Sequence, residues 1–303
     1  MSTLELIKNS RIKWPISLFI LVICFVLGAG ILRGILFLNG IPIDDNQSLV
    51  DLLANPEKRW VIRLAFGASH FVGFILSSFA IGAILGYIHM PKIVTWIKGF
   101  EVKLLAAWLM LLLVCYPFAG ALGYLAGKIP LPEWLSEAED SSYRALEGLI
   151  TMEDSWQLLG NLIIIAIIPG VGEEMFFRGI IQTYLQNRYR SQWIVLLASA
   201  FIFAAFHLQF AGFFPKLVIG WVLAASYYYT QNLIYPILIH MINNGFQVWV
   251  AYLHPERIEE SADIPAPTGV QVMLVVLTLP VIYILFQYIT KKYKDGRSIE
   301  NVT

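Results

Sequence analysis

Charged residues are scarce in this sequence. Lysine, arginine, aspartate and glutamate make up 14% of the 303 residues, whereas hydrophobic residues make up 58%. Soluble domains carry about 25% charged residues, so an ordinary water-exposed surface is excluded. The formal net charge is zero, which leaves no overall field to attract nucleic acid. The composition predicts a polytopic membrane protein surrounded by the lipid bilayer, without a nucleic-acid partner.

Cysteine is also scarce. The two cysteines, Cys24 and Cys115, both lie inside apolar runs. Their spacing is not that of a CxxC pair, and their surroundings argue against a disulfide. Buried cysteine behaves as a small hydrophobic residue, so both are interpreted as packing residues. The sequence also lacks internal repeats and low-complexity tracts, and we expect a single membrane domain over residues 1–303.

Long apolar runs indicate the fold class. A helix needs about 20 apolar residues to cross the hydrocarbon core of a bilayer. By that length the sequence predicts an all-α protein with about eight transmembrane helices, at Trp14–Leu38, Trp60–Tyr87, Leu104–Ala126, Trp156–Leu185, Trp193–Phe213, Lys216–Tyr229, Leu233–Leu253 and Val270–Thr290. The first run is longer than the apolar part of a signal peptide, so we expect a retained helix.

The distribution of basic residues predicts the orientation. With eight spans, the short basic segments all fall on one side, which the positive-inside rule assigns to the cytoplasm. We therefore expect both termini in the cytoplasm and, for a bacterial source, a place in the cell inner membrane. The basic residues that carry this argument are Lys8, Arg11, Lys13, Lys92, Lys98, Lys103, Arg188, Arg190, Lys291, Lys292, Lys294 and Arg297.

Charges interrupt the fourth apolar run. Glu173, Glu174 and Arg178 follow the apolar stretch 161–170. A charge at the centre of a bilayer costs about 2.5–3.5 kcal/mol on insertion scales, so a function is expected there. Neighbouring helical residues point about 100° apart, so the two glutamates face different surroundings. Glu174 and Arg178, at i and i+4, can pair, which leaves Glu173 as the carboxylate available for chemistry.

Further polar residues are expected at a similar depth. His207 falls in the middle of the fifth expected span, and His240 and Asn244 fall in the middle of the seventh. Phe203 lies one turn before His207, and His240 lies one turn before Asn244, so each couple shares a helix face. We expect a buried site among the fourth, fifth and seventh helices, with Glu173 and these three polar residues lining one cavity.

Three motifs together resemble a known family. They are Glu173-Glu174-x-x-x-Arg178, Phe203-x-x-x-His207 and His240-x-x-x-Asn244, in this order on successive apolar helices. They resemble the motifs of the CAAX protease and bacteriocin-processing (CPBP, or Abi) family. Its best-known members are intramembrane endopeptidases that cleave prenylated CAAX proteins after the modified cysteine. The resemblance covers residues 156–253, the expected catalytic core, and implies a membrane-embedded or lipidated peptide as substrate.

The resemblance also implies a role for each motif residue. Glu173 would be the general base that activates water, and His207 would help to hold that water. His240 and Asn244 would stabilise the oxyanion of the tetrahedral intermediate, where one donor is worth about 2.7–4 kcal/mol. The supporting residues would be Glu174, Arg178 and Phe203.

A metal-dependent mechanism is an alternative. Glu173, His207 and His240 form an acceptable zinc set with water in the fourth position. However, the sequence has no HExxH, the signature of many zinc proteases, and asparagine is an unusual zinc ligand. No cofactor is favoured, and zinc remains the alternative.

Two other functions use the same residues. A proton-coupled transporter could use buried glutamate and histidine side chains as a relay, although transporters usually show internal repeats. A non-catalytic membrane scaffold could retain the residues without chemistry. Outside the motifs, His70 is interpreted as a structural histidine that bonds a backbone carbonyl, with a relay role as the alternative. Arg33 and Arg63, near span ends, are expected to extend toward the membrane surface.

Overall fold

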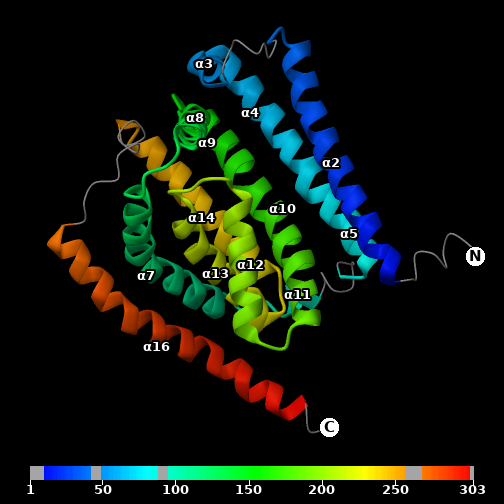
Figure 1. Cartoon of the computed structure of the whole chain (residues 1–303), viewed down its shortest axis with the longest axis vertical. Coiled ribbons are helices and arrows are strands. Elements are labelled where there is room, and N and C mark those ends of the chain that lie inside the picture. The colour runs from blue at the N-terminus through cyan, green and yellow to red at the C-terminus, as the bar shows by residue number, and fades with distance from the viewer. Residues whose placement is uncertain (1–9, 42–48, 88–94, 257–267, 301–303) are drawn as a thin grey trace, which may run out of the picture. The chain divides into compact units, whose positions relative to one another are not determined.

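The computed structural model describes residues 10–41, 49–87, 95–256 and 268–300, and in these ranges every regular element is a helix (Figure 1). The all-α prediction is therefore confirmed for the described residues. The chain contacts divide it into two units. The first comprises residues 1–95, 140–183 and 240–261, and the second comprises residues 96–139, 184–239 and 262–303. The expectation of one membrane domain stays a prediction.

Three long helical stretches make up most of the first unit. The first stretch is α2 (Ser10–Leu38), and α3 (Leu49–Ala54) follows it. The second joins α4 (Pro56–His70), the π-helix η1 (Phe71–Leu76) and α5 (Ser77–Leu85). The third joins α9 (Ser155–Asn161), η2 (Leu162–Ile167), α10 (Ile168–Phe176), η3 (Phe177–Gln182) and α11 (Thr183–Arg188), and its last residues belong to the second unit.

The stretch formed by α4, η1 and α5 packs against both α2 and α10. α2 lies beside α4, η1 and α5, as Figure 1 shows, and α10 packs against η1. At one end, a buried apolar cluster joins α2, α3, α4 and the end of α8 (Glu133–Ile150); its members are Leu36, Ile41, Leu52, Leu53, Ile62, Ala65 and Leu149. This packing fixes α4, and therefore η1, beside the helix that carries the charged motif.

The second unit contains α7 (Val102–Gly127), α12 (Gln192–Phe206), α13 (Phe213–Thr230) and α16 (Gly269–Glu300). α13 packs against α12 and α7, and α7 packs against α16. A Cβ atom on Gly220 would lie 2.8 Å from Cδ1 of Phe203, so the glycine allows α12 and α13 to approach closely. α14 (Ile234–Leu253) and α8 run through both units.

Five helices are long and apolar enough to cross a bilayer, and the chain is a multi-pass membrane protein. They are Lys13–Leu38, Pro56–Leu85, Val102–Gly127, Ser155–Arg188 and Val272–Lys291, which match five of the eight expected spans. The other three expected spans are helices, but α12 is shorter and α14 carries several polar residues. The count of eight therefore stays a prediction.

The fifth expected span is wrong at its end. α12 ends at Phe206, and His207 occupies the C-cap instead of the middle of a helix. Leu208 then adopts a left-handed conformation with φ of 53°, which stops the helix. Leucine is disfavoured in that conformation, so the apolar sequence carries no stop signal at this point.

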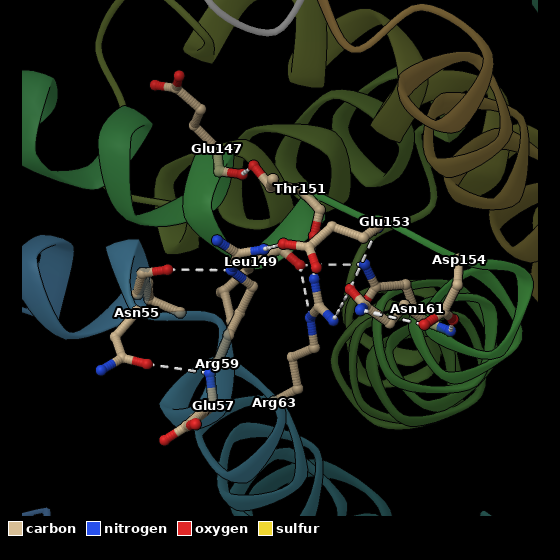
Figure 2. Close-up of polar contacts among 12 residues, drawn as sticks. Asn55, Glu57, Arg59, Arg63, Glu147, Leu149, Thr151, Glu153, Asp154 and Asn161 are labelled. Carbon is tan, nitrogen blue, oxygen red and sulfur yellow. Dashed lines mark hydrogen bonds and ion pairs between the residues drawn. The ribbon is translucent and has the colours of Figure 1, made fainter.

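Arg63 holds the end of α8 against the start of α9 (Figure 2). Its Nε donates to the carbonyl of Leu149 at 2.9 Å, and its Nη1 donates to Oε1 of Gln157 at 3.2 Å. Its Nη2 donates to the carbonyl of Thr151. The prediction that Arg63 extends toward the membrane surface is wrong, because the residue is 1% exposed and its donors satisfy carbonyls that α8 leaves at its end.

Two neighbours extend this polar cluster. Arg59, one turn earlier on α4, donates to the carbonyl of Leu53 at 3.0 Å and pairs with Glu153 at 3.3 Å. Asn161 of α9 donates to the carbonyl of Leu149 at 3.0 Å. Figure 2 shows these groups meeting where α4, α8 and α9 come together. The contacts fix where the motif-bearing helix begins.

We predict that Arg63→Met destabilises the protein. Methionine keeps a long apolar stem but leaves buried carbonyls without donors, at a cost of about 1–3 kcal/mol for each unsatisfied group. Thermal melting of the detergent-solubilised protein measures the change. Arg33→Met is the matched control, since Arg33 is exposed on α2, and it should melt at or above the wild-type temperature. Equal melting of Arg63→Met and wild type would contradict the prediction.

Candidate active site

The helix that carries the charged motif departs from regular α geometry on both sides of the motif. π-Helical turns, with one extra residue per turn, precede and follow α10 as η2 and η3. Pro169 contributes to the first irregularity, because it has no N–H to donate to the carbonyl of Ile165, four residues earlier. Such turns occur often at functional sites. Here they flank the segment that contains both glutamates.

Asn244 of α14 bonds the carbonyl of Ile165, to which Pro169 cannot donate. Its Nδ2 donates to the carbonyl of Ile165 at 3.2 Å, and its Oδ1 accepts from Nδ2 of Asn243 at 3.0 Å. An amide nitrogen carries two hydrogens, so one donor of Asn244 is not required for the Ile165 bond. The third motif is thus tied to the first through the backbone irregularity at Pro169.

Two glycines allow neighbouring helices to approach α10. A Cβ atom on Gly170 would lie 2.5 Å from Cγ of Met241 and 3.1 Å from its backbone nitrogen. A Cβ atom on Gly172 would lie 2.9 Å from Cβ of Phe74. Such distances are too short for any larger residue without displacement of the partner. Gly170 therefore sets the approach of α14, and Gly172 sets the approach of η1.

Glu174 is the centre of a buried charged group. Its Oε1 accepts from Nη1 of Arg178 at 2.9 Å, which is the predicted i,i+4 pair, and from Nδ1 of His240 at 2.8 Å. Glu174 and Arg178 are 0% exposed and His240 is 4% exposed. Sequence spacing predicts the pair with Arg178 but not the contact with His240, which joins α10 to α14.

Glu173 faces a different partner. Its Oε1 lies 3.5 Å from Nε2 of His70, which is ion-pair distance, and the two side chains are 11% and 14% exposed. The His70 ring stacks on Phe74 with 4.4 Å between ring centroids. The two adjacent glutamates therefore have separate surroundings, as their helical spacing predicts.

Three of the four predicted catalytic residues lie in the first unit. Glu173, His240 and Asn244 come from α10 and α14 within residues 140–183 and 240–261. His207 belongs to the second unit, and the single cavity predicted for all four stays a prediction.

The second motif has its own local geometry. Nδ1 of His207 lies 2.9 Å from the carbonyl oxygen of Phe203, one turn earlier. The two rings meet edge to face with 4.8 Å between centroids. Phe203 is buried, 2% exposed, beside Gly220. The bond to a backbone carbonyl fixes the orientation of the imidazole at the end of α12.

His70 lies close to Glu173, although its place in the sequence predicts a structural histidine and keeps a relay role only as the alternative. It lies in no motif, and an isolated histidine in an apolar run is most often structural. The signal that was available is depth, because His70 lies well inside an expected span. A histidine at that depth needs a polar partner.

The chemistry of the first unit is that of a carboxylate beside a preorganised polar group. Oε1 of Glu174 already accepts two hydrogen bonds, whereas Oε1 of Glu173 lies near Nε2 of His70. Among the described residues, no group of three or more histidine, cysteine, aspartate or glutamate side chains is arranged to hold a metal ion. The zinc alternative stays a prediction.

Comparison with known proteins gives two matches to peptidases. Residues 155–246 match the family described as type II CAAX prenyl endopeptidase, Rce1-like. The chain is also 32% identical over 104 residues to the membrane-embedded CAAX protease MroQ of Staphylococcus aureus (strain USA300).

The coverage of this relative is partial. The alignment covers 33% of this chain and 42% of the relative, so the chain matches less than half of that protein's length. No solved structure matches the chain. The family match runs from the start of α9 into α14 and includes all seven motif residues. The segment 155–246 therefore resembles the type II CAAX prenyl endopeptidases, the family that its three motifs predict.

Proposed function

We propose that the chain is an intramembrane endopeptidase that hydrolyses a peptide bond of a membrane-embedded or lipidated peptide, with Glu173 as general base. The observation that carries the proposal is that the two adjacent glutamates have different contacts. Oε1 of Glu174 is bonded by Arg178 and His240, whereas Oε1 of Glu173 lies at ion-pair distance from Nε2 of His70. The family match and the relative's name, a CAAX protease, support the same reaction.

In the proposed reaction, Glu173 takes a proton from water and the water oxygen attacks the peptide carbonyl carbon. His207 helps to hold that water. The tetrahedral intermediate collapses, the C–N bond breaks, and the proton passes from Glu173 to the leaving amine. Water supplies both new bonds, to the acyl carbon and to the amine nitrogen, so no other reactant is needed.

The oxyanion is stabilised from α14. Nδ1 of His240 is engaged by Glu174, so Nε2 is the nitrogen that serves the substrate. In the doubly protonated ring, both nitrogens donate, and Nε2 can donate to the oxyanion. The second N–H of Asn244 is the other donor. One such donor typically contributes about 2.7–4 kcal/mol.

The substrate is proposed by class only. Burial of Glu173 within a membrane-spanning helix restricts access to peptides that lie in or at the bilayer. A lipid-modified chain end and a transmembrane segment both meet this requirement. The two are distinguished by assaying a prenylated peptide against the same peptide without its prenyl group, and against a transmembrane reporter.

We predict that Glu173→Gln abolishes cleavage while the fold persists. Glutamine keeps the size and one acceptor but cannot take a proton from water. General-base catalysis contributes about 10²–10⁴-fold, so at least that loss is expected. The measurement is cleavage of a membrane-embedded reporter peptide, with and without chelator, beside thermal melting.

Glu133→Gln is the control for this experiment. It makes the same change at an exposed position of α8 and should leave cleavage unchanged. Cleavage by Glu173→Gln within tenfold of wild type would refute Glu173 as the base. Loss of wild-type cleavage on chelation would establish the zinc alternative. A wild type that cuts no peptide but moves protons across vesicles would establish the transporter alternative.

We predict that Glu174→Gln acts on stability. Removal of one member of a buried ion pair leaves an uncompensated charge, at a cost of about 3–5 kcal/mol. Here two donors, on Arg178 and His240, lose their carboxylate. The variant should melt at a lower temperature than Glu173→Gln, which carries the same change one residue away. A fully stable but inactive Glu174→Gln would exchange the roles of the two glutamates.

We also propose that both termini are cytoplasmic, from the basic segments named above, of which Lys8 and Lys92 lie outside the described residues. Single cysteines at Lys98 and Glu137, in a variant without Cys24 and Cys115, test this in intact cells. A membrane-impermeant maleimide should label the Glu137 position and not the Lys98 position. Labelling in the opposite sense would reverse the orientation.

A further inference from the structure

His70 connects the stretch formed by α4 and η1 to the charged motif on α10. It is the last residue of α4 and directly precedes η1. His70 is distant in sequence from all three motifs, yet its Nε2 is 3.5 Å from Oε1 of Glu173. Catalytic hydrogen bonds are often long in the absence of substrate and tighten in the complex. The distance is therefore compatible with a hydrogen bond during the reaction.

The charges around the motif give this contact its importance. The Arg178 guanidinium donates to Glu174. His240 also bonds Glu174. Oε1 of Glu173 lies at ion-pair distance from Nε2 of His70. A buried carboxylate is stabilised by a nearby donor, so His70 decides in part where the Glu173 carboxylate lies.

The His70 ring packs on Phe74, which is itself held against α10. The two rings stack with an interplanar angle of 26°. Phe74 in turn contacts Phe176 of α10, with 5.8 Å between ring centroids, and lies against Gly172. The imidazole is therefore supported by Phe74 of η1, which packs against α10, the helix that carries Glu173. Such support is what a positioning group requires.

We propose that His70 is a positioning residue for Glu173, which holds one carboxylate oxygen so that the other is directed at the attacking water. This rests on the proposed function, because it assigns His70 a task in that reaction. His70 does not touch the substrate in this proposal. It sets the side-chain conformation of the base, and a misplacement of about 1 Å at a reacting group can cost 10²-fold in rate.

The test compares three variants with wild type. His70→Leu removes the donor and keeps an apolar side chain on Phe74; kcat should fall by about 100-fold with KM within about threefold, because only positioning is lost. His70→Gln retains an amide donor and should recover most of the lost kcat. His254→Leu is the matched control, since this exposed histidine also pairs with a carboxylate, that of Glu256 at 3.1 Å, and it should leave both constants unchanged.

A second measurement does not depend on activity. Melting temperatures of His70→Leu, Glu173→Gln and the double variant form a cycle, and residues in contact give non-additive changes. Additive changes overturn the contact. Wild-type kcat in a folded His70→Leu, or no recovery in a folded His70→Gln, overturns the positioning role. If wild type cleaves no peptide, the proposed function fails and the positioning role fails with it, whereas the melting cycle still decides the contact.

Discussion

The site in the first unit depends on one buried carboxylate. Glu174 is 0% exposed, and its Oε1 accepts from Arg178 on the same helix and from His240 on α14. Three ionisable groups at this depth are tolerated only together, because an unpaired buried charge costs several kcal/mol. The pairing therefore fixes α14 against α10. Once these two helices are held, the third motif is placed beside the first.

The backbone is adapted to this pairing. Gly170 admits α14 to within contact of the α10 backbone, and Pro169 leaves the Ile165 carbonyl for Asn244. A regular helix with larger residues would keep α14 at a greater distance and would satisfy its own carbonyls. The irregular geometry of this stretch is thus the means by which Asn244 and His240 reach their partners. Local helix regularity is lost, and contacts between helices replace it.

Helices and contacts between residues close in sequence can be predicted from the sequence, whereas contacts between distant residues cannot. Apolar length predicts five of the membrane-crossing helices, and i,i+4 spacing predicts the Glu174–Arg178 pair. The end of α12 at His207 is missed because a leucine takes the left-handed conformation that a glycine would signal. The burial of Arg63 is missed because its partners are carbonyls about 86 and 88 residues away, which no spacing rule links to it.

The surroundings of the two glutamates also bear on the choice between reactions. Oε1 of Glu174 already accepts two hydrogen bonds, one from Arg178 and one from His240, which suits a structural role. A relay across the membrane would need the proton to leave Glu173 through a neighbour that can release it again. The proposed hydrolase needs less, because Glu173 would take a proton from water and return it to the leaving amine within one cycle. The arrangement proposed here, with one carboxylate that gains and loses a proton beside a fixed ion pair, therefore suits peptide hydrolysis better than proton transport.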